Sequence, residues 1–230
     1  STAAITPIQF CEKYCQYVDE GYTDVIHVPI NRSGSSTYNN AVMAQGMLRE
    51  ERPEHHLNIH LLDPHTYSMV FGWYLCEMAR KLQNGAELRH VISEFETQMN
   101  KMEVILGPYS LKQMKKSGRI SAAAAVMGEL MGIRPIITLI DGKTRVESKV
   151  RGDDKVIPAM IDLCKKRTEG VEDFDYMIGH TSIPQAAELE KACRKAFGKA
   201  PLTTFNLGGV VSANTGPDTL ALIYVGKARD

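Results

Sequence analysis

The segment from residue 24 to residue 47 constrains the fold most, because an apolar run passes through a short polar turn straight into a helix. Val25–Ile30 has the length and composition of a buried strand. Gly34 frees the turn, and a hydroxyl residue within Ser35–Thr37 is placed to cap the helix that follows. Most serine-rich turns of this kind act only as caps. A helix N-terminus with nearby hydroxyls also favours a carboxylate or phosphate, so the segment is a candidate anion site.

The first hundred residues alternate helices and strands. Apolar residues at helical spacing, such as Phe10, Tyr14 and Val18, predict helices, and short apolar runs between turn residues predict strands. In order, we expect a helix ending at Gly21, a strand over Val25–Ile30, a helix from Thr37 that stops before Pro53, a strand over Asn58–Leu62, a helix through Met69 to Ala79 and a helix over Ala86–Asn100. This order favours a parallel sheet with helices on its faces.

The second half has a different character, because Asp141-Gly142 is a strong hairpin signal that introduces antiparallel pairing. In order, we expect a strand over Glu103–Leu106, a brief helix ending near Lys115–Arg119, a helix over Ala122–Met131, strands over Pro135–Ile140 and Val146–Val150, a helix over Asp153–Arg167, a strand over Tyr176–His180, a helix over Pro184–Phe197, and strands around Phe205–Val211 and Leu220–Val225. The predicted fold is therefore α/β with two α/β domains. Residues 1–100 carry a mainly parallel sheet flanked by helices, and residues 101–230 carry a mixed or antiparallel sheet and helices.

The charge balance argues against nucleic acid as a partner. Lys and Arg together number 27, as do Asp and Glu, so the formal net charge is zero rather than strongly positive. No apolar run approaches the length of a membrane span, and the start of the chain lacks a charged segment followed by a long apolar one. We therefore expect a soluble cytoplasmic protein without a transmembrane segment.

The cysteines indicate buried, reduced thiols. Their number is odd, which does not suit a disulfide framework, and they are Cys11, Cys15, Cys76, Cys164 and Cys193. Cys11 and Cys15 have the i, i+4 spacing that brings two helical side chains together. Because no second Cys or His pair at zinc spacing accompanies them, we expect packing rather than redox or metal chemistry, and no metal or cofactor.

Five short motifs, weak singly and stronger together, resemble one family. They are Asn31–Asn39, Lys115–Ser121, Gly132–Ile136, Lys149–Gly152 and Thr215–Pro217, in this order along the chain. In this combination the chain resembles the DegV family of bacterial lipid-binding proteins, which includes the carrier subunit of fatty-acid kinase. Members of that family begin with a further strand and helix carrying an Asp-Ser motif. The chain is expected to lack this segment, so that Ser1 corresponds to the family's Thr-Ser loop.

The resemblance implies that a long-chain fatty acid lies between the two domains. A threonine and a serine from two loops of the first domain would hold its carboxylate. The threonine matches Thr2, a family histidine falls on Asn214, and a family glycine falls on Asp218. The expected carboxylate site comprises Thr2, Arg32, Ser33, Gly34, Ser35, Ser36 and Asn214.

The family's ligand serine has two candidate counterparts. In an ungapped alignment anchored on Thr37–Asn39 the usual Ser-Ser pair falls on Asn31 and Arg32. A guanidinium at this position would replace a neutral hydrogen bond with a charge-assisted one, about twice as strong. Alternatively, the loop shifts by one residue, so that Ser33 supplies the hydroxyl and Arg32 points to solvent. The sequence leaves both arrangements open.

The resemblance also implies a role without catalysis. The protein would present the carboxylate to a separate kinase catalytic subunit, and Arg119 and Arg151, in glycine-flanked turns, would face that partner. The second domain would cover the acyl chain. Candidate wall residues, most of which core packing also explains, are Val126, Met127, Leu130, Met131, Ile137 and Leu139.

Two other classes of function remain open. A serine-dependent acyl hydrolase could use Ser35 or Ser36 with His180, although no Gly-x-Ser-x-Gly elbow surrounds the serines and no acid is obviously placed to orient the histidine. A small-anion sensor without lipid would also suit the changes at Arg32 and Asn214. The histidines His55, His56 and His60 lie in a charged stretch and are expected on a solvated surface rather than at a metal.

Overall fold

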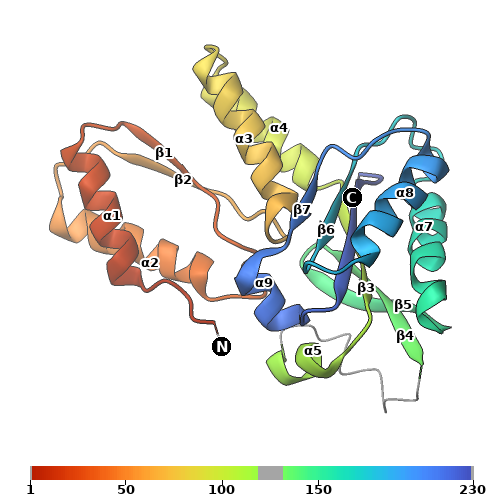
Figure 1. Cartoon of the computed structure of the whole chain (residues 1–230). Helices are drawn as coiled ribbons and strands as arrows, with labels where there is room; N and C mark the ends of the chain where they lie inside the picture. Colours follow the sequence, from red (N-terminus) through yellow and green to blue (C-terminus); the bar gives the residue numbers. More distant parts are fainter. Residues whose placement is uncertain (1, 119–131, 229–230) are drawn as a thin grey trace. The chain divides into compact units, whose positions relative to one another are not determined.

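The computed structural model describes residues 2–118 and 132–228, which form two compact units. The smaller unit is Thr2–Tyr67, and the larger begins at Ser68. Figure 1 shows the elements of each unit. The expected helix over Ala122–Met131 lies outside the described residues. So do Arg119 and four of the candidate wall residues, which are Val126, Met127, Leu130 and Met131.

The small unit is a parallel two-stranded sheet with two helices. Its elements are α1 (Pro7–Asp19), β1 (Asp24–His27), α2 (Thr37–Glu51) and β2 (Asn58–Leu61). The two strands pair in parallel with Asp24 opposite Asn58, as the alternating pattern predicts. β1 ends at His27, before the predicted limit at Ile30. Pro29 has no N–H to donate to the ladder, which explains the early end.

The two helices of the small unit pack together over one face of its sheet (Figure 1). Thr6 begins α1 with a capping box: its side chain accepts from the backbone of Gln9, and the Gln9 side chain accepts from the backbone N–H of Thr6. The buried residues of this core are Phe10, Cys11, Tyr14, Ala41, Ala44, Leu48 and Leu57. Because this core includes alanines of α2, the two helix axes can approach closely.

The large unit contains a six-stranded mixed sheet in the order β5-β4-β3-β8-β6-β7. Its strands are β3 (Met102–Pro108), β4 (Ile133–Ile140), β5 (Lys143–Arg151), β6 (Tyr176–His180), β7 (Thr204–Asn206) and β8 (Thr219–Val225). All neighbouring pairs are antiparallel except β6 and β7, which are parallel. Asp141 and Gly142 both have positive φ in the β4–β5 turn, as an Asp-Gly hairpin requires.

The helices of the large unit cover its sheet and extend beside it. They are α3 (Met69–Gln83), α4 (Leu88–Met99), α5 (Lys112–Ser117), the short η1 (Asp153–Lys155), α7 (Val156–Arg167), α8 (Gln185–Phe197) and α9 (Gly208–Thr215). α7 and α8 lie side by side on one face of the sheet (Figure 1). Their apolar residues form one core with β3, β4, β6 and β8. The α/β class with a small parallel and a larger mixed sheet, predicted from the sequence, is confirmed.

Two details differ from the sequence-based expectation. The predicted strand over Phe205–Val211 is wrong beyond Asn206, because Gly208–Thr215 is the helix α9. Residues 68–100 were expected in the first domain, whereas the helices α3 and α4 belong to the larger unit. The two helices pack against each other, and Gln98 Nε2 donates to Tyr74 Oη at 3.1 Å.

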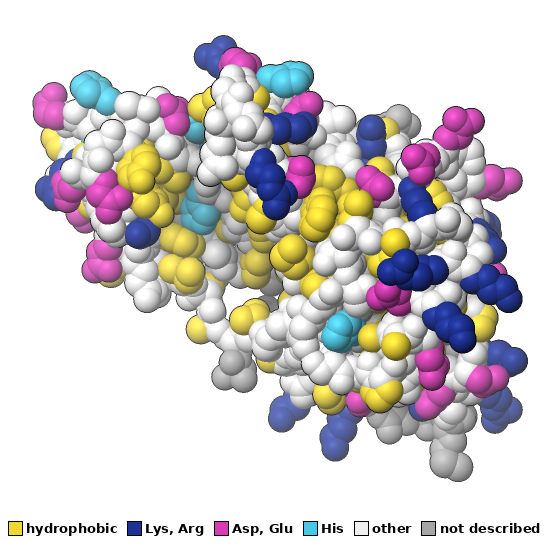
Figure 2. Space-filling view, turned by 45° about the horizontal axis from the view of Figure 1, so that its top comes forward, with side chains coloured by type: hydrophobic (Ala, Val, Ile, Leu, Met, Phe, Trp, Pro, Cys, Tyr) yellow, Lys and Arg dark blue, Asp and Glu magenta, His cyan; other side chains and the backbone are white. Residues whose placement is uncertain are grey.

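The described surface carries mixed charge. On the face seen in Figure 2, Lys and Arg side chains alternate with Asp and Glu side chains. None of the described helices is both long and apolar enough to traverse a bilayer.

Candidate functional site

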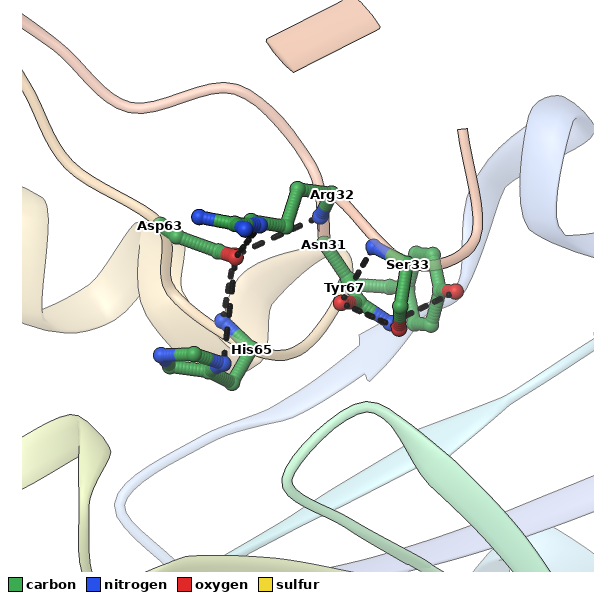
Figure 3. A network of polar contacts seen from close by, with 6 residues as sticks. All are labelled: Asn31, Arg32, Ser33, Asp63, His65 and Tyr67. Carbon is green, nitrogen blue, oxygen red and sulfur yellow. Dashed lines mark hydrogen bonds and ion pairs between the residues drawn. The ribbon is translucent and has the colours of Figure 1, made fainter. Parts of the chain in front are cut away.

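The loop between β1 and α2 is organised by the buried side chain of Asn31, which is 1% exposed. Its Oδ1 accepts from the backbone N–H of Ser33 at 3.2 Å and from Ser33 Oγ at 3.0 Å. Its Nδ2 donates to Tyr67 Oη at 3.0 Å. The Asn31 backbone N–H donates to the carbonyl of Thr66 at 3.0 Å. One side chain therefore ties this loop to the segment that follows β2 (Figure 3).

Gly34 is the closest point between these two segments. A Cβ built on Gly34 would stand 1.8 Å from Tyr67 Oη. The φ of Gly34 is not in the positive region, so the requirement for glycine comes from close approach rather than from backbone conformation. The Tyr67 phenol thus sets the path of the loop that carries Arg32 and Ser33.

Arg32 projects from this loop beside the carboxylate of Asp63. The Arg32 side chain is 62% exposed and the Asp63 side chain 9% exposed, with Arg32 Nε 3.8 Å from Asp63 Oδ2. The Asp63 Oδ1 accepts from the backbone N–H of His65 at 3.0 Å and from that of Arg32 at 3.4 Å. The guanidinium also lies 5.5 Å from the ring centre of Tyr38. Figure 3 shows Arg32 and His65 converging on Asp63. The guanidinium is thus positioned from two sides while remaining open to solvent.

The hydroxyl groups at the start of α2 form local hydrogen bonds. Ser35 Oγ accepts from the backbone N–H of Thr37 at 3.2 Å and lies 2.7 Å from Thr37 Oγ1. Ser36 stands at the N-cap position, yet its side chain makes no capping hydrogen bond. Of the three hydroxyl residues expected to cap this helix, Ser35 therefore satisfies a first-turn N–H group, while the exposed Ser36 does not.

The segment that contains Thr2 is tied to the same helix. Thr2 is exposed, and three residues later the carbonyl of Ile5 accepts from Asn40 Nδ2 at 2.7 Å. Asn40 lies in the first turn of α2, because its backbone N–H donates to the carbonyl of Ser36. Three extended residues span at most about 11 Å, so Thr2 lies within about that distance of Ile5, which contacts the first turn of α2. Its contact with a ligand stays a prediction.

The other predicted site residues belong to the large unit. Asn214 is half-buried in α9, where its Nδ2 donates to the carbonyl of Val210 at 2.8 Å and its own carbonyl accepts from Ser117 Oγ at 3.1 Å. Arg151 is exposed at the end of β5. Of the candidate wall residues, Ile137 and Leu139 are buried in β4.

The histidines make local contacts. His180 Nδ1 accepts from the backbone N–H of Ser182 at 3.0 Å. His60 Nε2 lies 2.9 Å from Asp24 Oδ1, and this hydrogen bond holds the pKa of Asp24 below its usual value. His55 Nδ1 accepts from the backbone N–H of Leu57 at 3.1 Å. Across residues 2–118 and 132–228, no histidine joins a group of three or more candidate metal ligands.

The sequence did not predict that Asp63 and Tyr67 position the loop of Arg32. It also assigned no role to Asn31. Asp63 and Tyr67 lie more than thirty positions beyond the loop that they position. A signal for them did exist. The two parallel strands place their carboxyl ends at one edge, and ligands in such folds bind at that edge, so the residues following Leu62 are natural partners of those following Ile30.

Comparison with known proteins identifies the family. The model of the family described as "Uncharacterised protein, DegV family" matches residues 1–227. The chain belongs to the DegV family. A DegV domain-containing protein of Clostridium perfringens is 29% identical over 98% of this chain and 77% of its own length. Another, from Staphylococcus aureus, is 28% identical over 95% of this chain and 75% of its own length.

Solved structures of other DegV proteins share the fold. A stearic acid-binding protein of Eubacterium ventriosum superposes with a TM-score of 0.86 at 20% identity, covering 98% of this chain and 78% of that one. A fatty acid-binding DegV protein of Streptococcus agalactiae superposes with a TM-score of 0.84 at 25% identity, covering 99% of this chain and 78% of that one. A DegV protein of Eubacterium eligens, loaded with heptadecanoic acid, superposes with a TM-score of 0.78 at 21% identity, covering 99% of this chain and 80% of that one.

Proposed function

We propose that this DegV protein binds a long-chain fatty acid and holds its carboxylate at the Asn31-organised loop, with Arg32 as the main donor. The observation that carries the proposal is an exposed guanidinium on a loop that is held in place: the Arg32 side chain is 62% exposed, while the neighbouring Asn31 is 1% exposed. The fatty acids named for the relatives from Eubacterium ventriosum and Eubacterium eligens support the ligand class.

The structure favours Arg32 over Ser33 as the head-group donor. A carboxylate accepts hydrogen bonds and needs donors. Ser33 Oγ already donates to Asn31 Oδ1 at 3.0 Å, so its proton is engaged within the loop. The exposed ion pair of Arg32 with Asp63, at 3.8 Å, is worth about 0–1 kcal/mol, whereas a hydrogen bond to a charged group contributes about 1.5–3 kcal/mol. A ligand carboxylate can therefore compete for Arg32.

The tail and the head of the ligand have different tasks. Burying about fourteen methylenes at roughly 0.8 kcal/mol each contributes about 11 kcal/mol before the costs of association. The head group contributes the smaller amount given above. The acyl chain therefore sets the affinity, and Arg32 sets the orientation and the preference for an acid. Gly34, Ser35 and Ser36 complete the polar rim in this proposal, with Thr2 and Asn214 as further contacts.

The affinity of four variants tests the role of Arg32. Arg32→Ala should weaken fatty-acid binding about 10- to 100-fold, the equivalent of losing a charge-assisted hydrogen bond. Arg32→Lys should retain part of the affinity, and Ser33→Ala should cost less than Arg32→Ala. Arg89→Ala, at an exposed arginine of α4, is the matched control and should change nothing. Equal affinities for wild type and Arg32→Ala would contradict the assignment.

The identity of the ligand separates the competing functions. Native mass spectrometry of the purified chain should show a co-purifying fatty acid. A bound sugar phosphate, or another small polar anion, would instead support a small-anion sensor. A covalent acyl adduct after treatment with an activated ester would support a serine hydrolase. Either of the last two results would overturn the proposal.

We further propose that the protein acts in the cytoplasm as a non-catalytic carrier that presents the carboxylate to a separate kinase subunit. The exposed Arg151, at the end of β5, would face that partner, together with Arg119. Arg151→Ala should leave fatty-acid binding unchanged and lower acyl-phosphate formation when the kinase subunit and ATP are added. Arg145→Ala, exposed on the same strand, is the control. Loss of fatty-acid binding in Arg151→Ala would contradict a partner-facing role.

A further inference from the structure

Two thiols and a carboxylate converge between the helices of the small unit, away from the loop that holds Arg32. Cys11 and Cys15 lie one turn apart on α1, and Glu51 is the last residue of α2. Their three candidate ligand atoms all lie within 4.8 Å of one another. The Cys15 Sγ is 3.6 Å from Glu51 Oε2. The cluster joins two elements that are far apart in the sequence and packed side by side in Figure 1.

The spacing matches that of ligands around one metal ion. Zinc binds thiolates at about 2.3 Å and carboxylate oxygens at about 2.0–2.2 Å in tetrahedral geometry. A sulfur and an oxygen ligand of one ion therefore stand about 3.6 Å apart, and two sulfur ligands about 3.8 Å apart. The 3.6 Å between Cys15 Sγ and Glu51 Oε2 agrees with this separation. The Cys11 thiol lies within 4.8 Å of both other ligand atoms, so a movement of at most about an ångström would bring it to the same separation.

The electrostatic setting favours a cation with high affinity for sulfur. Glu51 stands at the C-terminus of α2, where the helix dipole favours positive charge. Burial raises the pKa of Cys11 to about 12, and it also raises the pKa of Cys15. Both thiols are therefore protonated until a metal displaces their protons. Hard ions such as Mg²⁺ and Ca²⁺ prefer oxygen ligands, whereas thiolates select zinc-class ions.

We propose that Cys11, Cys15 and Glu51 form a binding site for a zinc-class divalent cation, with three protein ligands and a fourth position for solvent. The bound ion would link α1 to α2 and so stabilise the small unit. The proposal does not depend on the fatty-acid function.

The exposure of the three residues distinguishes this cluster from ordinary packing of cysteines. Cys11 is 2% exposed, but Cys15 is half-buried and Glu51 is exposed, so an ion can enter from the Glu51 side. Cys164 and Cys193, by contrast, are both fully buried. Neither joins a three-ligand group in the part of the chain that the structure describes.

Titration of the reduced, chelator-treated full chain with Cd²⁺ and with Zn²⁺ tests the proposal. Cd²⁺ should produce a thiolate-to-metal charge-transfer band that saturates at one ion per chain, and calorimetry with Zn²⁺ should give the same stoichiometry. Cys11→Ser and Cys15→Ser should each lower the affinity at least tenfold and weaken the band. Cys76→Ser, at an exposed cysteine of α3, should leave both signals intact.

Glu51→Gln protects the test against loss of folding, because this side chain is exposed. The variant should keep the wild-type circular dichroism spectrum and bind Zn²⁺ at least tenfold more weakly. Zn²⁺ should raise the Tm of the wild type and not that of Cys11→Ser/Cys15→Ser, since an ion that binds the folded state stabilises it. Absence of stoichiometric binding to the wild type, or full binding to the double variant, would overturn the proposal.

Discussion

Gly34 and Tyr67 are in such close contact that a single added methyl group would stand 1.8 Å from the Tyr67 hydroxyl oxygen. The two residues come from the two loops that follow β1 and β2. The contact therefore sets the separation of the two segments that carry Arg32 and Asp63. The geometry of the proposed head-group site depends on it.

Gly34→Ala should weaken both the fold of the small unit and fatty-acid binding. The loop must move away from Tyr67, and overpacking of this kind costs about 1–3 kcal/mol. Chemical denaturation and fatty-acid titration measure the two effects. Gly46→Ala in α2 is the matched control, because a Cβ there meets nothing within 4 Å and alanine favours a helix by about 0.5–1 kcal/mol. A Gly34→Ala protein as stable and as active in binding as wild type would contradict this account of the loop.

The ion pair between Glu103 and Arg167 should contribute more to the stability of the large unit than an ion pair on its surface. Glu103 is 6% exposed, accepts from Arg167 Nη2 at 3.1 Å and from Tyr224 Oη at 2.7 Å. Arg167 is 30% exposed, so water can solvate part of the charge that is left, and Glu103→Ala should lower the free energy of unfolding by about 1.5–3 kcal/mol, the contribution of hydrogen bonds to a charged group. Glu77→Ala, which breaks an exposed helical pair with Arg80, should cost about 0.2–0.5 kcal/mol. Equal losses in the two variants would be inconsistent with the buried network.

The small unit should lose stability in mild acid. His27 packs against Phe10 at 4.8 Å between ring centres, its Nδ1 is 2.6 Å from Tyr14 Oη, and burial lowers its pKa. Below about pH 6.5 the unfolded chain binds a proton at His27 that the folded chain does not, so stability falls as the pH drops from that value toward the folded pKa.

Unfolding measured between about pH 7.5 and about pH 5.5, one unit either side of the ordinary histidine pKa, tests this prediction. His27→Gln should flatten the acid side of the curve. His56→Gln, at an exposed histidine of the loop before β2, should leave the curve unchanged. A wild-type curve as flat as that of His27→Gln would rule out this histidine as the cause.

Local patterns predicted most of the fold. β6 has the predicted bounds, and α2 begins at the predicted Thr37, because strand-length apolar runs and hydroxyl-rich turns act locally. The helix α9 was missed because Val210 and Val211 have strand-like propensity. In the structure Gln113 and Ser117 of α5 donate to the carbonyls of Ala213 and Asn214, so tertiary contacts override local preference.

The candidate site was predictable only in part, since its parts come from separate segments. The family resemblance indicated Arg32 and Ser33 as site residues, and the strand–turn–helix pattern predicted that they lie in the turn before α2. The pattern does not show that Asn31 donates to Tyr67, thirty-six positions later in the chain. Nor does it show that the carboxylate of Asp63 positions Arg32, because that contact exists only when the parallel strands are paired.

The most direct test of the central claim compares a long-chain fatty acid with its methyl ester, in wild type and in Arg32→Ala. The ester keeps the tail and removes the charge that Arg32 is proposed to bind. The account predicts that wild type prefers the acid by about tenfold or more, the equivalent of one charge-assisted hydrogen bond, and that Arg32→Ala loses this preference. Equal affinity of wild type for acid and ester, or an undiminished preference in Arg32→Ala, would contradict it.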